Sequence, residues 1–225
     1  MRNLAALIVM LLLSGFILSC TTVPFTDRQQ LSFIPSQTMQ QLGEDQYQEF
    51  LRNHELGGSE EQQARVKRVG RRVADAVETY FRQRGMTARV DEYDWEFNLI
   101  QDDAVNAWCM PGGKVAVYTG LLPVAEDETG LAVVVAHEIA HAVADHGNER
   151  MSQGLLVQFG GLALSQYLQN RPEATRDLWA NVYGYGAQYG ALYPYSRIQE
   201  KEADRMGLTF MAMAGYDPKA AVDFW

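Results

Sequence analysis

Apolar residues recur at helical spacing in several long stretches of the chain. One helix is predicted over residues 36–54 and a second over residues 59–85, where valines fall on one face. Ser59 begins a Ser-x-x-Gln motif, a capping box that marks a helix N-terminus. A last helix is predicted over residues 198–214, before Gly215. The chain is therefore expected to be mostly helical.

The middle of the chain adds two strands and a buried helix. Residues 93–99 alternate strictly between apolar and polar side chains, which predicts a half-buried strand. Residues 114–119 follow the Pro-Gly-Gly turn at 111–113 and predict a second strand. After Asp127, a candidate N-cap, the strongly apolar run over residues 131–146 predicts a helix. Helices, a small antiparallel sheet and helices again indicate an α+β fold, mostly α.

The N-terminus has the pattern of a secretory signal. Arg2 precedes an apolar run over residues 4–18, and about 15 residues is short for a membrane span, which needs roughly 20. The tetrapeptide Ile-Leu-Ser-Cys that ends at Cys20 resembles a bacterial lipobox, although Leu18 stands where a small residue is commoner. We therefore expect a signal peptide over residues 1–20 and lipid on Cys20. Simple secretion and an uncleaved anchor are the alternatives.

Composition describes a globular chain. Hydrophobic residues make up 47% of the 225 residues, enough for a packed core. The net charge of −9 argues against a surface that binds nucleic acid. Residues 21–35 hold two prolines and no clear period, which predicts a tether before one domain over residues 36–225. Residues 154–168 are too short and too polar for a membrane span, and predict a buried hairpin or lid.

The strongest chemical signal is an HExxH pattern, which begins at His137 and ends at His141. Positions i and i+4 share one face of a helix, so both imidazoles can reach one metal ion. A zinc ion there would activate a water for attack on a carbonyl, and Glu138 could take its proton as general base. Two histidines at the edge of a core are the alternative, but burying His, Glu and His together without a metal is costly.

The third metal ligand is open on spacing alone. The acidic candidates downstream are Glu149, Glu173, Glu200 and Glu202. Glu200 stands out because Asp204 follows at i+4 on a predicted helix, where one carboxylate can bind the metal and the other can orient an imidazole. A solvated helix face is the alternative for this cluster. Glu202 is expected to point away from the metal, and His146 is expected at the surface, on the same helix as the HExxH pattern.

Three motifs in order resemble the M48 family of zinc metallopeptidases, the HtpX- and BepA-like enzymes. They are HEIAH at 137–141, SRIQEKEAD at 196–204, and an Asn-Ala…Pro-Gly-Gly segment at 106–113 that leads into the strand over 114–119. The resemblance covers about residues 36–225. It implies a zincin-like domain with one Zn²⁺ per chain, Glu200 as third ligand and Asp204 behind a ligand imidazole. It also implies that Asn106 helps to hold the substrate or to polarise its carbonyl.

The resemblance implies a zinc-dependent endopeptidase for unfolded or misassembled envelope proteins, which would bind as extended strands beside the sheet. The lipobox favours the periplasmic lipoprotein branch of the family, anchored by an N-terminal lipid. Thr21 rather than Asp follows Cys20, which favours the outer membrane. A zinc-binding lipoprotein chaperone or scaffold with little proteolysis is the alternative.

One feature of that branch is not matched. Its members commonly carry a further His or Arg after the Glu-x-x-x-Asp helix, and this sequence has no His beyond His146. Either that element is missing, or the chain is a truncated form, or another residue serves. Tyr193, Tyr195 and Arg197 are candidates to serve in its place, with a structural role as the alternative for each. Cys109 is expected to be a semi-buried, inert thiol.

Overall fold

The computed structural model describes residues 20–225, and their side chains except those of residues 189–191 and 193–195. The chain divides into two compact units. One takes the residues up to Pro35 and Asn148–Arg197, and the other takes Ser36–Gly147 and Ile198–Trp225. Residues 1–19 of the predicted signal peptide, which ends at Cys20, lie outside the described part. Within that part, none of the helices combines the length and apolar character that a bilayer crossing requires.

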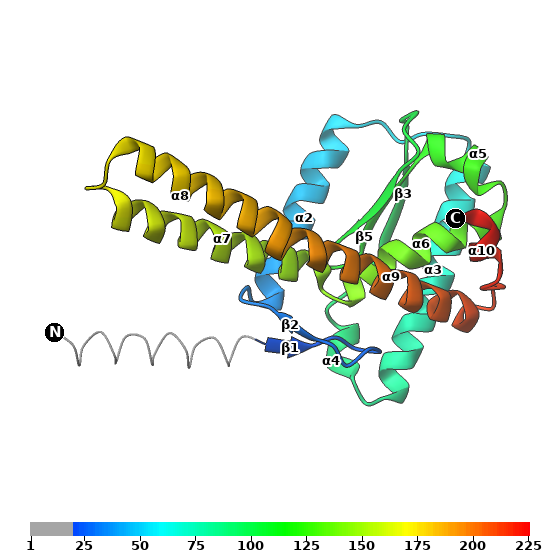
Figure 1. Cartoon of the computed structure of the whole chain (residues 1–225). Helices are drawn as coiled ribbons and strands as arrows, with labels where there is room; N and C mark the ends of the chain where they lie inside the picture. The colour runs from blue at the N-terminus through cyan, green and yellow to red at the C-terminus, as the bar shows by residue number, and fades with distance from the viewer. Residues whose placement is uncertain (1–19) are drawn as a thin grey trace. The chain divides into compact units, whose positions relative to one another are not determined.

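The larger unit begins with two of the predicted helices. Helix α2 spans Ser36–Asn53 and helix α3 spans Glu60–Gln83 (Figure 1). The capping box is formed, because the Ser59 hydroxyl accepts from the Gln62 N–H and the Gln62 side chain accepts from the Ser59 N–H. Both predicted helices are confirmed.

A three-stranded sheet follows, in the order β3-β5-β4. Strand β3 spans Glu96–Ile100, β4 spans Ala107–Met110 and β5 spans Lys114–Tyr118. β3 pairs with β5 in parallel and β4 pairs with β5 antiparallel, so the sheet is mixed. The sequence pattern does not predict β4, which takes an edge position.

Helices cover both faces of this sheet. On one face, Tyr47 of α2 donates to the Val115 carbonyl at 3.1 Å and accepts from the Asn98 amide at 3.1 Å. On the other face, Phe97 lies against Gly70 of α3. β3 is therefore buried on both faces, and the predicted half-buried strand is wrong, because α2 covers the side that carries Asn98.

The remaining elements of this unit lead to the candidate site. Helix α6 spans Glu128–Val143. Its predicted N-cap is confirmed, because the Asp127 carboxylate accepts from the backbone N–H groups of Thr129 and Gly130. The shorter helices are α4 (Thr87–Val90), α5 (Leu122–Ala125) and α10 (Ala220–Phe224). Helix α9 spans Tyr193–Met213 and confirms the last predicted helix, with an earlier start. The fold is α+β and mostly α, as predicted.

The smaller unit begins with an antiparallel pair of strands, β1 (Cys20–Thr22) and β2 (Gln29–Leu31). Val23 is fully buried, and the Arg28 guanidinium donates to both carboxylate oxygens of Glu149 at 2.8 Å. The segment expected as a tether thus contains a folded hairpin held to helix α7 (His146–Leu168).

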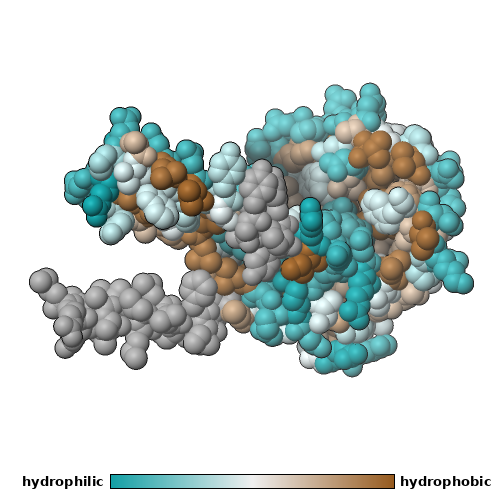
Figure 2. All heavy atoms as spheres, viewed as in Figure 1, coloured by the Kyte–Doolittle hydropathy of each residue, from teal (hydrophilic) through white to brown (hydrophobic). Residues whose placement is uncertain are grey.

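Two long helices complete this unit. α7 is followed by α8 (Glu173–Tyr185) and by a π-helical segment, Gly186–Leu192. The Tyr183 hydroxyl donates to the Val157 carbonyl at 2.7 Å, which holds α8 against α7. The predicted burial of residues 154–168 is wrong, because this segment is part of α7 and exposes Phe159 and Leu162. Figure 2 shows apolar residues at the surface of these helices.

The contact between α3 and β3 gives a test of the fold. A Cβ at Gly70 would lie 2.2 Å from the Phe97 ring, so Gly70→Ala forces the ring or the helix to shift. We expect the free energy of unfolding in urea to fall by about 1–3 kcal/mol. Gly154 of α7 has no atom within 4 Å of its missing Cβ, so Gly154→Ala should instead add about 0.5–1 kcal/mol. Equal stability of the two variants would contradict the close α3–β3 contact.

Candidate metal centre

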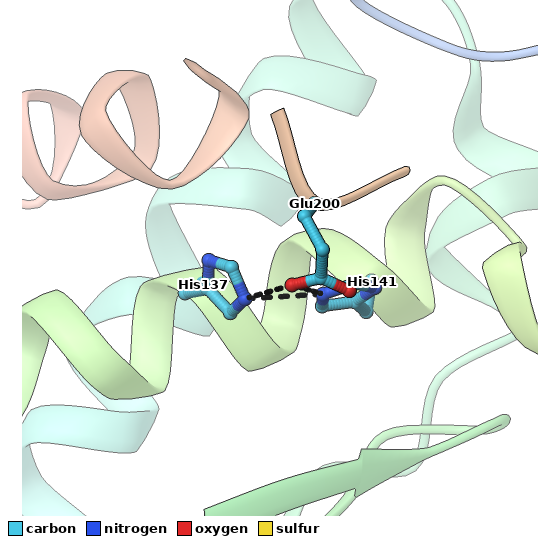
Figure 3. A group of neighbouring side chains, drawn as sticks. All are labelled: His137, His141 and Glu200. Carbon is cyan, nitrogen blue, oxygen red and sulfur yellow. Dashed lines mark hydrogen bonds and ion pairs between the residues drawn. The ribbon is translucent and has the colours of Figure 1, made fainter. Parts of the chain in front are cut away.

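His137 and His141 lie one turn apart on α6, and their Nε2 atoms are 3.1 Å apart. Glu200 reaches them from α9, with Oε2 at 3.4 Å from His137 Nε2 and at 3.5 Å from His141 Nε2. Figure 3 shows the carboxylate facing both rings. Within the described residues, these three side chains form a group that could hold a metal ion.

The spacing of these atoms suits a metal. In a tetrahedral zinc site with bonds of about 2.0–2.1 Å, neighbouring ligand atoms lie about 3.3–3.4 Å apart. The three measured separations are 3.1, 3.4 and 3.5 Å. Imidazole nitrogen and carboxylate oxygen are also among the donors that zinc takes. Two ring lone pairs and a carboxylate facing one another repel unless a cation lies between them, so the donor set fits a metal centre.

Asp204 stands behind the first ring. Its Oδ1 lies 3.0 Å from the buried Nδ1 of His137, although the angle is poor for a hydrogen bond. A carboxylate in this place accepts the Nδ1 proton and leaves Nε2 free for a metal. The structure thus brings Asp204 to one ligand imidazole and Glu200 to the Nε2 atoms.

A glycine lets α9 approach α6. A Cβ at Gly207 would lie 3.2 Å from the His137 backbone nitrogen and 3.3 Å from the Ala136 carbonyl carbon. Such distances are tighter than most side chains allow, so the absence of a side chain here permits the close helix contact. That contact brings the carboxylates of Glu200 and Asp204 within reach of the imidazole rings on α6.

Glu138 lies on the side of α6 that faces β4. It is half-buried, and its charge adds to burial, the larger cause, in raising the pKa of the Cys109 thiol well above its usual range. Cys109 therefore stays protonated at neutral pH and is no competing nucleophile or ligand. It is a free, partly buried cysteine, as the sequence predicts.

Residues 60–225 match the profile of peptidase family M48. The chain belongs to this family. It is 30% identical over 206 residues to the mitochondrial metalloendopeptidase OMA1 of Schizosaccharomyces pombe, covering 90% of this chain and 56% of that protein. It is 35% identical over 132 residues to a putative beta-barrel assembly-enhancing protease of Vibrio cholerae, covering 57% of this chain and 27% of that protein. This M48 chain thus spans about a quarter to just over half of these relatives.

His146 overturns a prediction. It is fully buried, with Nδ1 at 2.8 Å from His141 Nδ1 and Nε2 at 2.9 Å from Glu202 Oε2. The expectation of a surface histidine on the HExxH helix is wrong, because α6 ends at Val143 and Asp145 turns the chain with a φ of 55°. Glu202 lies outside the ligand group, as expected, but it is 7% exposed, so the alternative of a solvated helix face does not hold for this residue.

Other predicted site residues lie elsewhere. Asn106 is exposed just before β4, where its carbonyl accepts from the Tyr118 N–H at 3.0 Å. Among the contacts of the described residues, none ties the Asn106 side chain to the ligand group. The alternative third ligands do not join this group either, because Glu149 pairs with Arg28 and Glu173 is exposed at the start of α8.

Three residues are candidates for the role of the family's further His or Arg: Tyr193, Tyr195 and Arg197. Arg197 is exposed. The side chains of Tyr193 and Tyr195 lie outside the described ones.

The ligand geometry predicts about one zinc per chain, to be measured by metal analysis of the purified protein. His137→Ala or His141→Ala should abolish stoichiometric binding, because each removes a ligand of a three-residue set. Asp204→Ala should weaken affinity by about 10–100-fold, as loss of an orienting carboxylate does. His54→Ala is the matched control, since His54 is exposed and stacks on Phe50. Full zinc in either ligand variant would contradict the assignment.

Proposed function

We propose that this chain is a zinc-dependent endopeptidase that cleaves unfolded or misassembled envelope proteins. The observation that carries the proposal is the convergence of His137, His141 and Glu200 on one point, in a member of peptidase family M48. Asp204 orients His137 from behind, and Glu138 stands beside the ligands without joining them.

Zinc, when bound, supplies a Lewis acid that polarises the scissile carbonyl and lowers the pKa of the attacking water to about 7. Glu138 serves as the general base that takes the proton of this water, and it can return the proton to the leaving amine. The role needs a carboxylate that is not itself a ligand. The Glu138 side chain meets this requirement, because it faces β4 while Glu200 approaches the two rings from α9.

The edge strand β4 gives the substrate a place to bind. Asn106 O bonds to Tyr118 N, so alternate residues of the strand, including Trp108, point their backbone groups at β5. The N–H and C=O groups of Ala107 and Cys109 then point to the outer edge. An extended peptide that paired there would add a strand to the sheet, and it would pass Glu138, which lies close to Cys109.

The proposed substrates are chains that lack stable structure, because only an extended backbone can pair with an edge strand. An apolar cavity of about 270 Å³ adjoins His137 and favours the same class, since unfolded chains expose apolar side chains. It is lined in part by Val133, Met211 and Trp225.

The proposed location is the periplasmic face of the cell envelope, with the chain anchored by a lipid on Cys20, in the outer membrane. The lipobox pattern supports this location, and so do the relatives named beta-barrel assembly-enhancing protease. The relatives named mitochondrial metalloendopeptidase share the domain at similar identity, so the domain alone does not decide the compartment.

Glu138→Gln tests the proteolytic role. The variant should retain zinc, because Glu138 is not a ligand, and it should lose cleavage of an unfolded protein such as reduced casein by at least about 100-fold. Glu128→Gln, the same change at the first residue of α6, where the carboxylate pairs with Arg68, should leave cleavage unchanged. Equal cleavage by Glu138→Gln and wild type would refute the assignment of the base.

The same assay separates the enzyme from a scaffold. A zinc-loaded wild type that suppresses aggregation of the unfolded protein but leaves it intact would favour the chaperone or scaffold function. Cleavage that depends on both zinc and Glu138 would exclude that alternative.

The lipid anchor has its own test. When the chain is expressed in a Gram-negative host, mass spectrometry should find a mature N-terminus at Cys20 that carries lipid. Cys20→Ser should leave the precursor unprocessed by the lipoprotein pathway. Cys109→Ser, which changes a thiol in β4, should be processed like wild type. An unmodified mature terminus at or after Thr21 would reject the anchor.

A further inference from the structure

A buried polar pair stands behind the second ligand imidazole. His146 is fully buried at the start of α7, and its ring lies 4.9 Å from that of His141, centroid to centroid. Its Nδ1 is 2.8 Å from His141 Nδ1, and its Nε2 is 2.9 Å from Glu202 Oε2. A buried carboxylate and a buried ring are costly unless they are well paired, so these contacts hold one another in place.

The hydrogen-bonding capacities of His141, His146 and Glu202 determine which nitrogen of each ring carries a proton. An ionised carboxylate only accepts hydrogen bonds, so Nε2 of His146 carries the proton that bonds to Glu202. A neutral imidazole has one N–H, which leaves His146 Nδ1 as an acceptor. The proton between the two Nδ1 atoms therefore belongs to His141. This tautomer leaves the Nε2 lone pair of His141 free, at the point where Glu200 and His137 converge.

We infer that His146 and Glu202 are positioning residues, a relay that holds His141 in the tautomer and orientation that binds the metal. The inference rests on the metal site of the proposed function. It assigns to the second ring the same kind of support that Asp204 gives to the first. The two supports differ in exposure, since the side chain of Asp204 is 54% exposed and that of Glu202 is 5% exposed.

The relay explains why a glutamate occupies the core face of α9. Gln199, Ala203 and Met206 share that buried face with Glu202 at helical spacing. A glutamate there without a partner would destabilise the helix packing. Because Glu202 bonds to His146, it orients the ring of His141 without touching that ring.

The test compares zinc affinity and tautomer in matched variants. Glu202→Leu removes the acceptor and keeps a buried side chain, and His146→Leu removes the middle of the relay. Each should weaken zinc affinity by about 10–100-fold, measured by competition with a chromophoric chelator. The double variant should bind zinc about as tightly as the more impaired of the two single variants, because the two residues act as a unit. Glu202→Gln, which keeps one acceptor oxygen, should stay within a few-fold of wild type.

Met206→Ala controls for stability, because it removes a buried side chain from the same helix face without removing a hydrogen bond of the relay. It should lower the melting temperature and leave the zinc affinity unchanged. Loss of zinc in proportion to stability in all the variants, Met206→Ala included, would overturn the relay.

Imidazole ¹⁵N spectra of the zinc-free protein decide the tautomer directly and need no proteolysis. Wild type should show His141 protonated at Nδ1, and Glu202→Leu should shift a fraction to Nε2. A zinc-free His141 protonated at Nε2 in wild type would overturn the inference, even if Glu202→Leu fails to fold. A wild type with the expected tautomer and zinc affinity but no cleavage would instead leave the relay standing and refute the proposed endopeptidase.

Discussion

An imidazole presents its Nε2 lone pair to a metal only while its proton sits on Nδ1, so each ligand ring needs a hydrogen-bond acceptor behind it. In this chain α9 places Asp204 behind the ring of His137 and Glu200 in front of both rings. The ring of His141 is contacted from behind by His146, which in turn bonds to Glu202 of α9. The three acidic side chains involved are Glu200, Glu202 and Asp204. The site therefore depends on how closely α9 lies against α6, and Gly207 allows that approach.

The second constraint is the turn between α6 and α7. Arg89 holds it, donating to the Val143 carbonyl at 3.0 Å and to the Asp145 carboxylate at 3.1 Å. A cation at this place donates to a carbonyl left free at the helix C-terminus, and it interacts favourably with the negative end of the helix dipole. Since Asp145 has a left-handed backbone, the next residue, His146, leaves the direction of α6 and lies beneath His141. Arg89 of α4 thus helps to set the position of His146, the ring that contacts His141.

Local patterns in the sequence were enough for the features that local physics decides. The capping box at Ser59 and the N-cap at Asp127 need only neighbouring residues, and so does the placing of His137 and His141 on one helix face. The placing of Glu200 and Asp204 on one face of α9, four residues apart, also follows from neighbouring residues alone. These features follow from helix geometry, which does not depend on the rest of the fold.

The features that the sequence did not reveal depend on distant residues. A continuous apolar run suggested one helix through His146, and the break depends on Arg89, far away in sequence. The burial of Glu202 depends on a histidine partner 56 residues away. A half-buried strand was expected because Asn98 is polar, but α2 supplies it with the Tyr47 hydroxyl. For Glu202 and Asn98, a tertiary partner overrode the preference of a polar side chain for water.

Helix α6 keeps the ligands and the proposed base apart because it meets different neighbours on two sides. The ligand rings converge on Glu200 of α9, whereas Glu138 faces β4. Neighbours in sequence point about 100° apart around a helix, so His137 and Glu138 reach these two sides from consecutive positions. A peptide paired with the outer edge of β4 would then pass the base on the sheet side and the metal ligands on the helix side. The short edge strand, which no local pattern predicted, is what would align the scissile bond between them.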